Sequence, residues 1–149
     1  MVTALVEVLD LPESGRLKAA RAIDERLQRI PRTHLLTRMF MPALARCSEL
    51  ELRAVAHVRA ARAALAVERF RNKTGRLPAG LDDLVPQYLQ PAPADPFTGG
   101  PIKYRQLAKG YVVYSVGPDL SDDGGRERPT DRKAREAQPL YDITFVVER

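Results

Sequence analysis

The sequence predicts an α+β fold, in which a long spine helix packs against a small antiparallel β-sheet and an additional amphipathic helix comes first. No proline or glycine interrupts the chain from Ala43 to Lys73, so helical propensity is unbroken for about 31 residues. Short runs typical of strands follow at 102–105, 111–116 and 141–147. With 149 residues, of which 44% are hydrophobic, the chain can bury a single core of this kind.

The segment from Ser14 to Ile30 is predicted to form the additional amphipathic helix. Apolar residues recur there at helical spacing, opposite charged ones. Pro31 ends this helix, and Thr33 is a candidate cap for a short turn over 35–40. We therefore divide the chain into a helical extension, 1–41, and an α+β domain, 42–149. The apolar positions of the first helix are Leu17, Ala20, Ile23, Leu27 and Ile30.

The spine helix is predicted to start near Pro42, because a proline in the first turn loses no hydrogen bond. A break near Ser48 stays open, since few globular helices are this long. Gly75 supplies a left-handed exit after a last turn rich in cations. A stripe of small and apolar residues along its second half would let a sheet approach closely: Ala56, Ala60, Ala63, Val67 and Phe70.

The segment after the spine helix is predicted to cross it and then form a sheet. Residues 81–89 indicate a short helix interrupted at Pro86, and several prolines up to Pro96 force an extended path. Residues 102–105 and 111–116 alternate as in a hairpin with one buried face, with Ala108-Lys109-Gly110 between them. A third strand, Tyr141 to Val147, would pair with this hairpin to complete the sheet.

The loop between the second and third strands is the best candidate for chemistry. Asp119-Leu120-Ser121-Asp122-Asp123-Gly124 places oxygen side chains at the first, third and fifth positions and glycine at the sixth, as in the opening half of a calcium loop. Thr130 stands where an EF-hand requires its closing glutamate, so this is not an EF-hand. A solvated acidic turn without an ion is the alternative, and the residues leave both readings open.

These pieces follow one another in a specific order. The order runs through Thr74-Gly75-Arg76-Leu77-Pro78, Asp95-Pro96-Phe97-Thr98-Gly99-Gly100, Tyr114-Ser115-Val116-Gly117-Pro118-Asp119 and Asp122-Asp123-Gly124-Gly125. Over roughly Leu44 to Val147, the chain resembles the globular domain of the major pseudopilin of type II secretion systems, in the type IV pilin-like superfamily. The resemblance implies a non-catalytic structural protein at the periplasmic face of the inner membrane. Its partners would be other pseudopilin-like or secretion subunits.

The resemblance also implies a calcium ion in the acidic loop. Its ligands would be Asp119, then Asp123 or Asp122 as the second carboxylate, with Ser121 and the carbonyl of Val116 as weaker ones. Asp142 would reach the site from the last strand. The insertion at 126–136 is longer and more basic than the family pattern, and its cations would be able to replace the ion by pairing with the aspartates.

The prepilin leader and the apolar membrane helix of about 20 residues that pseudopilins carry are not visible here. We therefore expect a soluble relative, or a fragment of a longer envelope protein whose membrane anchor lies upstream. The chain alone is expected to be a monomer or a weak homodimer. Leu17, Ile23 and Leu27 would make the dimer contacts if the first helix does not fold back.

Residue types that usually carry catalysis are scarce in this sequence. His34 and His57 lie in no catalytic motif, and Ser115 lacks the turn that exposes a nucleophile. Cys47 is the single cysteine, and its apolar neighbours predict a small core residue. We therefore expect that the protein is not an enzyme.

The net charge of +5 and the pI of 9.7 favour a second class of function, a basic module that binds nucleic acid or an anionic surface. Arg16, Lys18, Arg21 and the segment 126–135 would supply the contacts. Most arginines are dispersed among carboxylates, however, and few aromatic residues lie near them to stack on bases. Nucleic acid is therefore the less favoured partner.

Overall fold

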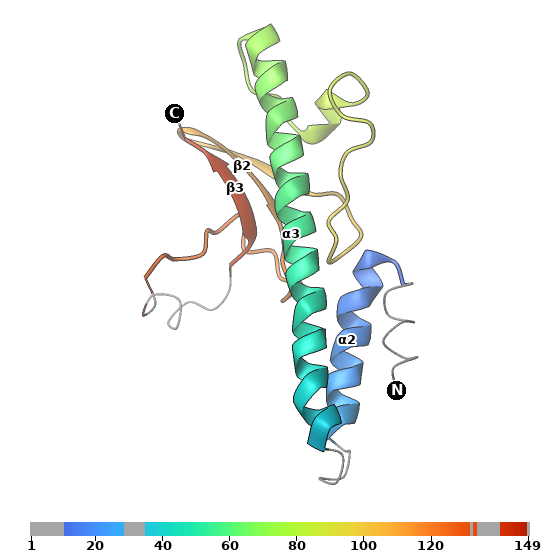
Figure 1. Cartoon of the computed structure of the whole chain (residues 1–149). Helices are drawn as coiled ribbons and strands as arrows, with labels where there is room; N and C mark the ends of the chain where they lie inside the picture. The colour runs from blue at the N-terminus through green and yellow to red at the C-terminus, as the bar shows by residue number, and fades with distance from the viewer. Residues whose placement is uncertain (1–10, 29–34, 132, 134–140, 149) are drawn as a thin grey trace.

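The computed structural model describes residues 11–28, 35–131, 133 and 141–148, and they form an α+β fold (Figure 1). Helix α2 spans Glu13–Gln28, α3 spans Leu35–Thr74, and the short 3-10 helix η1 spans Leu81–Leu84. Three strands follow, β1 (Lys103–Leu107), β2 (Gly110–Ser115) and β3 (Ile143–Val147). Among the residues described, none of the helices combines the length and the apolar character needed to span a membrane.

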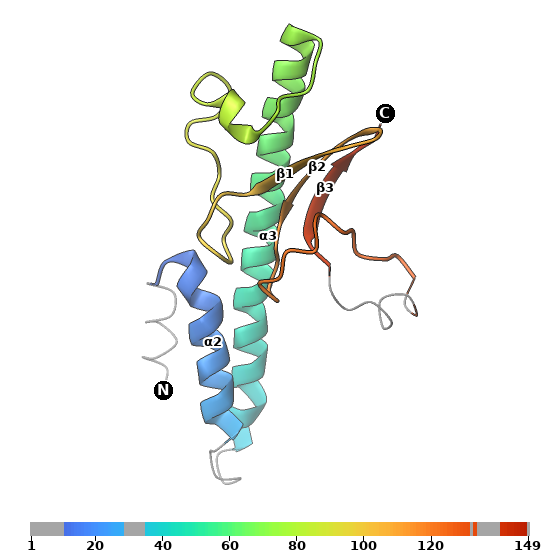
Figure 2. The same cartoon turned by 180° about the vertical axis from the view of Figure 1, so that it is seen from behind.

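Helix α3 organises the molecule. The sheet lies on one side of it, the segment that carries η1 lies on the other, and α2 runs alongside its N-terminal half (Figures 1 and 2). The three strands form one antiparallel sheet in the order β1-β2-β3, so the predicted hairpin and third strand are confirmed. In the register of this sheet, Val113 lies opposite both Tyr104 and Phe145.

Helix α3 is longer than the sequence predicted. It begins at Leu35 and contains 40 residues without a break at Ser48, so the separate turn expected over 35–40 is wrong. Residues 35–41 hold several good helix formers and no glycine, and the helix continues through Pro42 even though a proline there removes one backbone hydrogen bond and crowds the preceding turn. The predicted exit is confirmed, since Gly75 has φ 75° and its N–H donates to the carbonyl of Arg71 at 2.8 Å. Pro31 and Thr33 lie outside the described residues.

The main core lies between α3 and the sheet. The predicted stripe of small residues faces it, because Ala56, Ala60, Ala63 and Val67 are fully buried and Phe70 is half-buried. Tyr111 and Val113 of β2 pack against this stripe. The Tyr111 hydroxyl is buried among these residues and donates to the carbonyl of Ala64 or to Glu68, at 3.1 and 3.0 Å.

The prediction of a hairpin with one buried face is wrong for β2, which is buried on both faces. Tyr111 and Val113 face α3, whereas Val112 and Tyr114 are covered by the acidic loop. A Cβ placed on Gly125 would lie 2.9 Å from Cγ1 of Val112 and 3.1 Å from Cδ1 of Tyr114. The loop therefore rests on the outer face of the sheet, a contact between distant residues that strand periodicity does not reveal.

Helix α2 folds back onto α3. The condition for a dimer contact through its apolar residues, that this helix does not fold back, is therefore not met. Leu17 is buried in a second core cluster, with Leu52, Ala56, Phe97 and Ile143, so it is not available to another copy. Ile23 is half-buried, and the side chain of Leu27 lies outside the described set. The division into 1–41 and 42–149 stays a prediction, although α3 runs across residue 41 without interruption.

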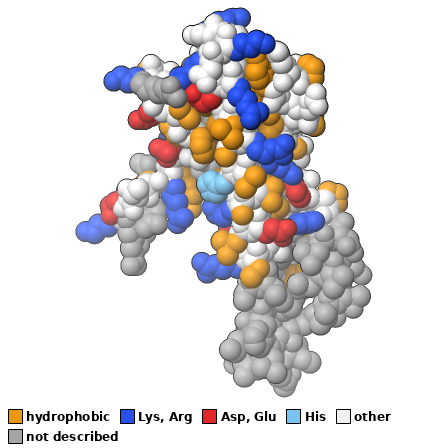
Figure 3. Space-filling model, turned by 45° about the horizontal axis from the view of Figure 1, so that its top comes forward, with side chains coloured by type: hydrophobic (Ala, Val, Ile, Leu, Met, Phe, Trp, Pro, Cys, Tyr) orange, Lys and Arg blue, Asp and Glu red, His pale blue; other side chains and the backbone are white. Residues whose placement is uncertain are grey.

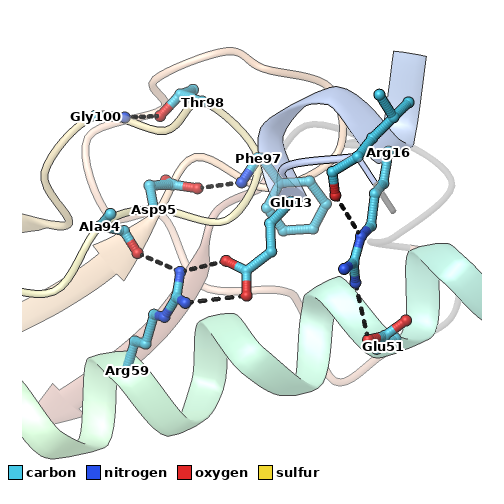
Figure 4. A network of polar contacts seen from close by, with 10 residues as sticks. Glu13, Arg16, Glu51, Arg59, Ala94, Asp95, Phe97, Thr98 and Gly100 are labelled. Atoms are coloured by element: carbon cyan, nitrogen blue, oxygen red, sulfur yellow. Dashed lines mark hydrogen bonds and ion pairs between the residues drawn. The ribbon is translucent and has the colours of Figure 1, made fainter. Parts of the chain in front are cut away.

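Polar contacts reinforce the packing of α2 (Figure 4). Arg59 of α3 pairs with Glu13 at 2.7 Å and donates to the carbonyl of Ala94 at 2.9 Å. Arg16 of α2 pairs with Glu51 of α3 at 3.2 Å. One arginine thus links the start of α2, the spine and the proline-rich segment.

Two further predictions about local structure need correction. Cys47 is exposed rather than part of the core, because the buried side of α3 is the opposite one, which contains Leu52 and Ala56. The short helix expected over 81–89 is reduced to the single 3-10 turn of η1, whose Leu81 and Leu84 are buried against the core.

Candidate functional site

The acidic loop, residues 116–125, leaves the end of β2 and folds back across the sheet. Glycines with positive φ make its turns, at Gly117 (77°), Gly124 (71°) and Gly125 (77°). The side chains that anchor it come from the sheet: Tyr114 in β2, Lys103 in β1, and Asp142 immediately before β3. The loop is therefore held at several points along its length.

Asp142 is the main anchor and is only 2% exposed. Its carboxylate accepts the N–H of Gly125 at 2.6 Å and that of Asp123 at 3.4 Å, while its own N–H donates to the carbonyl of Arg126 at 3.0 Å. Burial raises the pKa of Asp142, and the negative charge of nearby Asp123 raises it further. The negative charges of Asp142 and Asp123 therefore repel each other in a partly desolvated region.

The Asp123 side chain has one carboxylate oxygen in an unfavourable environment. Its Oδ2 is buried and has no hydrogen-bond partner in the described part of the structure. A buried carboxylate oxygen without a partner is costly. A cation that bridged Asp123 and Asp142 would satisfy this oxygen and reduce the repulsion between the two side chains. These two residues fit a cation such as calcium, which prefers carboxylate and carbonyl oxygens.

The negative charge of Asp122 is already balanced by side chains of the sheet. Its Oδ1 accepts from the Tyr114 hydroxyl at 3.1 Å and from the N–H of Gly124 at 3.0 Å, and its Oδ2 pairs with Lys103 at 3.0 Å. The Lys103 ammonium, chiefly, holds the pKa of Asp122 below its usual range. The cation that pairs with this aspartate thus comes from β1, whereas the sequence predicted cations of the basic insertion in this role.

The other predicted ligands differ from the anchored aspartates in burial and in their hydrogen bonds. Asp119 and Ser121 are exposed, and the Asp119 carboxylate accepts the N–H of Ser121 at 3.2 Å. Val116 is buried, and its N–H donates to Asp95 at 3.0 Å. Among residues whose placement is described, no three His, Cys, Asp or Glu side chains are grouped so that they could hold a metal ion. The predicted ligand set, which also includes a hydroxyl and a backbone carbonyl, therefore stays a prediction.

The basic insertion contacts the site through its first residues. The guanidinium of Arg128 lies 5.1 Å from the centre of the Tyr141 ring, next to Asp142. Residues 132 and 134–136 of the insertion lie outside the described residues. Whether its remaining cations pair with the aspartates therefore stays a prediction.

Asp95 is a buried anchor of the loop that was not among the predicted site residues. It is 1% exposed, and its two carboxylate oxygens accept the N–H of Phe97 at 2.8 Å and that of Val116 at 3.0 Å (Figure 4 shows the first bond). Val116 begins the acidic loop, so Asp95 fixes the point where the loop leaves β2. The turn sequence Asp-Pro-Phe-Thr-Gly-Gly was the available signal, since aspartate often accepts the N–H two residues later.

Of the side chains that could serve in catalysis, the structure describes His57 on α3 and Ser115 at the end of β2. His57 is exposed on α3, Ser115 is buried with its Oγ accepting the N–H of Gly117 at 3.3 Å, and His34 lies outside the described residues. An open groove of about 380 Å³ lies between α2 and residues Phe97 and Leu120. The expectation that the protein is not an enzyme stays a prediction.

Comparison of the chain with known protein families, with curated proteins and with solved structures finds no match.

Proposed function

We propose that this chain is a non-catalytic, pseudopilin-like structural and interaction domain of a bacterial envelope protein related to type II secretion. The observation that carries the proposal is the order of its elements along one long helix. A proline-rich crossing, a hairpin, an acidic loop and a last strand follow α3 in the sequence in which the resemblance requires them. The proposal places the domain on the periplasmic face of the inner membrane, with other secretion or envelope subunits as partners.

The acidic loop is proposed to be a calcium-stabilised element of this domain. Asp123 and Asp142 would form the centre of the site, because Oδ2 of Asp123 is buried near a second carboxylate and has no hydrogen-bond partner among the residues that the structure describes. Asp119, Ser121 and the carbonyl of Val116 are the further ligands that the resemblance supplies. When bound, calcium would contribute positive charge that offsets the repulsion between the aspartates.

Thermal unfolding with calcium tests the metal part of the proposal. We expect calcium added to chelator-treated protein to raise the melting temperature, magnesium to raise it less, and Asp123→Asn to remove the difference. Asp82→Asn is the matched control, because Asp82 is an exposed aspartate of η1 far from the loop in sequence. Identical melting curves for the original chain with and without calcium would remove the ion from the proposal.

Binding to secretion subunits tests the other part. We expect the chain to bind the purified periplasmic domain of at least one pseudopilin from the same organism, measured by calorimetry or NMR titration. Absence of binding to every pseudopilin of that organism would contradict the proposed function, whatever the loop binds.

The basic-module alternative has less support. Arg16 pairs with Glu51, and Arg21 donates to the carbonyl of Pro118 at 2.7 Å, so two of the three cations assigned to α2 already have partners within the chain. Lys18, the third of these cations, is exposed. A binding constant for DNA that falls steeply with salt would favour the alternative.

A further inference from the structure

Helix α3 has a second apolar face, on the side away from the core. Six small or apolar residues follow one another every three or four positions from Cys47 to Leu65, so they form a stripe about 27 Å long. Leu50, Val58 and Leu65 are 57%, 61% and 61% exposed. Figure 3 shows hydrophobic side chains gathered on the surface of the molecule among Lys and Arg side chains. The exposed stripe consists of Cys47, Leu50, Ala54, Val58, Ala61 and Leu65.

Most of this stripe points away from the buried side of α3, while Ala61 is half-buried and Leu65 borders a hollow that Tyr88 and Leu89 also line. The residues that contact α2 and the sheet, such as Leu52, Ala56 and Ala63, lie on the opposite side of α3. Contiguous exposed apolar patches are uncommon on monomeric proteins and often mark interaction sites. The stripe therefore indicates an interaction face.

We propose that a second copy of this chain covers the stripe, with the two α3 helices antiparallel and crossing near residue 56. In this arrangement each large side chain meets a small one. Leu65 lies opposite the second copy's Cys47, Leu50 opposite its Ala61, and Val58 opposite its Ala54. A parallel pairing in register would instead place Leu50 against Leu50 and Ala54 against Ala54, which leaves gaps between the helices.

The charges beside the stripe favour the same arrangement. Glu51 and Arg62 are both exposed and lie on the same flank of α3, at nearly equal distances from the crossing point. An antiparallel pair brings residues of the same flank together, so Glu51 of each copy faces Arg62 of the other. Arg16 uses Oε1 of Glu51 within the chain, but the Glu51 side chain stays 50% exposed. Two such ion pairs would fix the direction of the helices more than the affinity.

The contact is short, so the dimer is expected to be weak. Stable coiled coils need more turns than this stripe contains, and small interfaces are characteristic of transient association. This inference does not depend on the proposed function, because it concerns two copies of the same chain and uses none of the loop residues. Calcium dependence and pseudopilin binding could both fail while the dimer persists.

Analytical ultracentrifugation of the full chain tests the proposal. We expect reversible dimer formation at concentrations up to about 1 mM, the range of weak dissociation constants. Val58→Glu should remain a monomer, because it places two carboxylates near the crossing point, while helical circular dichroism is unchanged. Val85→Glu is the control, since Val85 is 41% exposed but lies outside α3, and it should dimerise like the original chain. A monomer throughout, or a dimer unaffected by Val58→Glu, overturns the proposal.

Disulfide formation tests the direction of the helices, since Cys47 is the only cysteine in the chain. Leu65→Cys places a new thiol against the second copy's Cys47, so oxidised glutathione should give a covalent dimer. The original chain should not cross-link, because its two Cys47 residues would lie about 27 Å apart in the antiparallel pair. Adding Val58→Glu to Leu65→Cys should abolish the cross-link. Covalent dimers of the original chain at the same rate would overturn the antiparallel arrangement.

Discussion

The carboxylate of Asp95 joins two segments that are far apart in sequence. Its Oδ2 accepts the N–H of Val116 at the end of β2, and its backbone N–H donates to the carbonyl of Gly100 at 2.6 Å. The turn before the sheet and the start of the acidic loop therefore depend on one buried side chain. Because both carboxylate oxygens have N–H partners, loss of the side chain would leave two buried donors unsatisfied.

We predict that Asp95→Ala lowers the free energy of unfolding by about 2 to 4 kcal/mol, the range for a buried charged group with two hydrogen bonds. Urea denaturation at neutral pH measures this value. Asp83→Ala is the comparison, because Asp83 is exposed and accepts one N–H, that of Ala79, at 2.8 Å. It should lose about 1 kcal/mol. Equal losses for the two variants would mean that Asp95 does not hold the loop.

Tyr114 gives the loop a dependence on alkaline pH. Burial raises the pKa of Tyr114 to about 12, and the charge of Asp122 next to its hydroxyl adds to the shift. The folded protein thus holds this proton more tightly than the unfolded chain, whose tyrosine titrates at about 10. Stability from this source is fully present below pH 10 and is lost as pH rises from 10 to 12.

We therefore predict that the free energy of unfolding falls by about 2 kcal/mol more in the original chain than in Tyr114→Phe between pH 10 and 12. Burial and Glu68 also raise the pKa of Tyr111, so the variant retains some of the decline. Urea titrations at a series of pH values give both curves. Parallel curves for the two proteins would show that Tyr114 is not the group responsible.

At the scale of elements, features that depend on local sequence were predicted better than contacts between distant segments. The stripe of small residues from Ala56 to Val67 and the exit at Gly75 follow from helix periodicity and glycine conformation, and both are confirmed. The exposure of Cys47 was missed because α3 has two apolar faces, and only tertiary packing decides which one is buried. The second buried face of β2 was missed for the same reason.

The two faces of α3 lead to a matched prediction. Ala63→Arg should lower the free energy of unfolding by about 3 kcal/mol or more, because Ala63 is fully buried against the sheet and the charge would have no partner there. Ala54→Arg, on the exposed side of the same helix, should change it by about 0.5 kcal/mol or less. Denaturation at low protein concentration compares them without interference from self-association. Equal stability of both variants would show that the stripe facing the sheet is assigned wrongly.

At the scale of the whole molecule, the candidate site depends on segments that no local motif connects. The sequence pattern identified the loop from Asp119 to Gly124, but Lys103, Tyr114 and Asp95 come from elsewhere in the chain. Asp142 was included only through the resemblance, and the structure makes it the buried anchor of the loop. Motif spacing identifies residues that are adjacent in sequence, whereas the fold determines which distant residues compensate their charges.

The packing of α2 against several other elements indicates whether this helix belongs to the α+β unit. Leu17 is 5% exposed and shares a cluster with Leu52 of α3, Phe97 of the crossing segment and Ile143 of β3. A core cluster that joins α2 to three other elements should couple α2 to the unfolding of the rest. The polar links from Glu13 to Arg59 point the same way, since Arg59 also binds the carbonyl of Ala94.

We predict that Leu17→Ala lowers the stability of the whole chain by about 2 to 4 kcal/mol while unfolding stays a single transition. The tyrosines described lie outside α2 and α3, so tyrosine fluorescence reports on the rest of the fold. Its unfolding midpoint should equal the midpoint measured by helical circular dichroism. Leu50→Ala is the control, because Leu50 is 57% exposed on the far side of α3, and it should cost about 0.5 kcal/mol or less at low protein concentration. If the helical signal fell first and the tyrosine signal kept its original midpoint, α2 would be an independent extension, as the division at residues 1–41 and 42–149 supposes. A common midpoint would instead make α2 part of the core that positions the acidic loop.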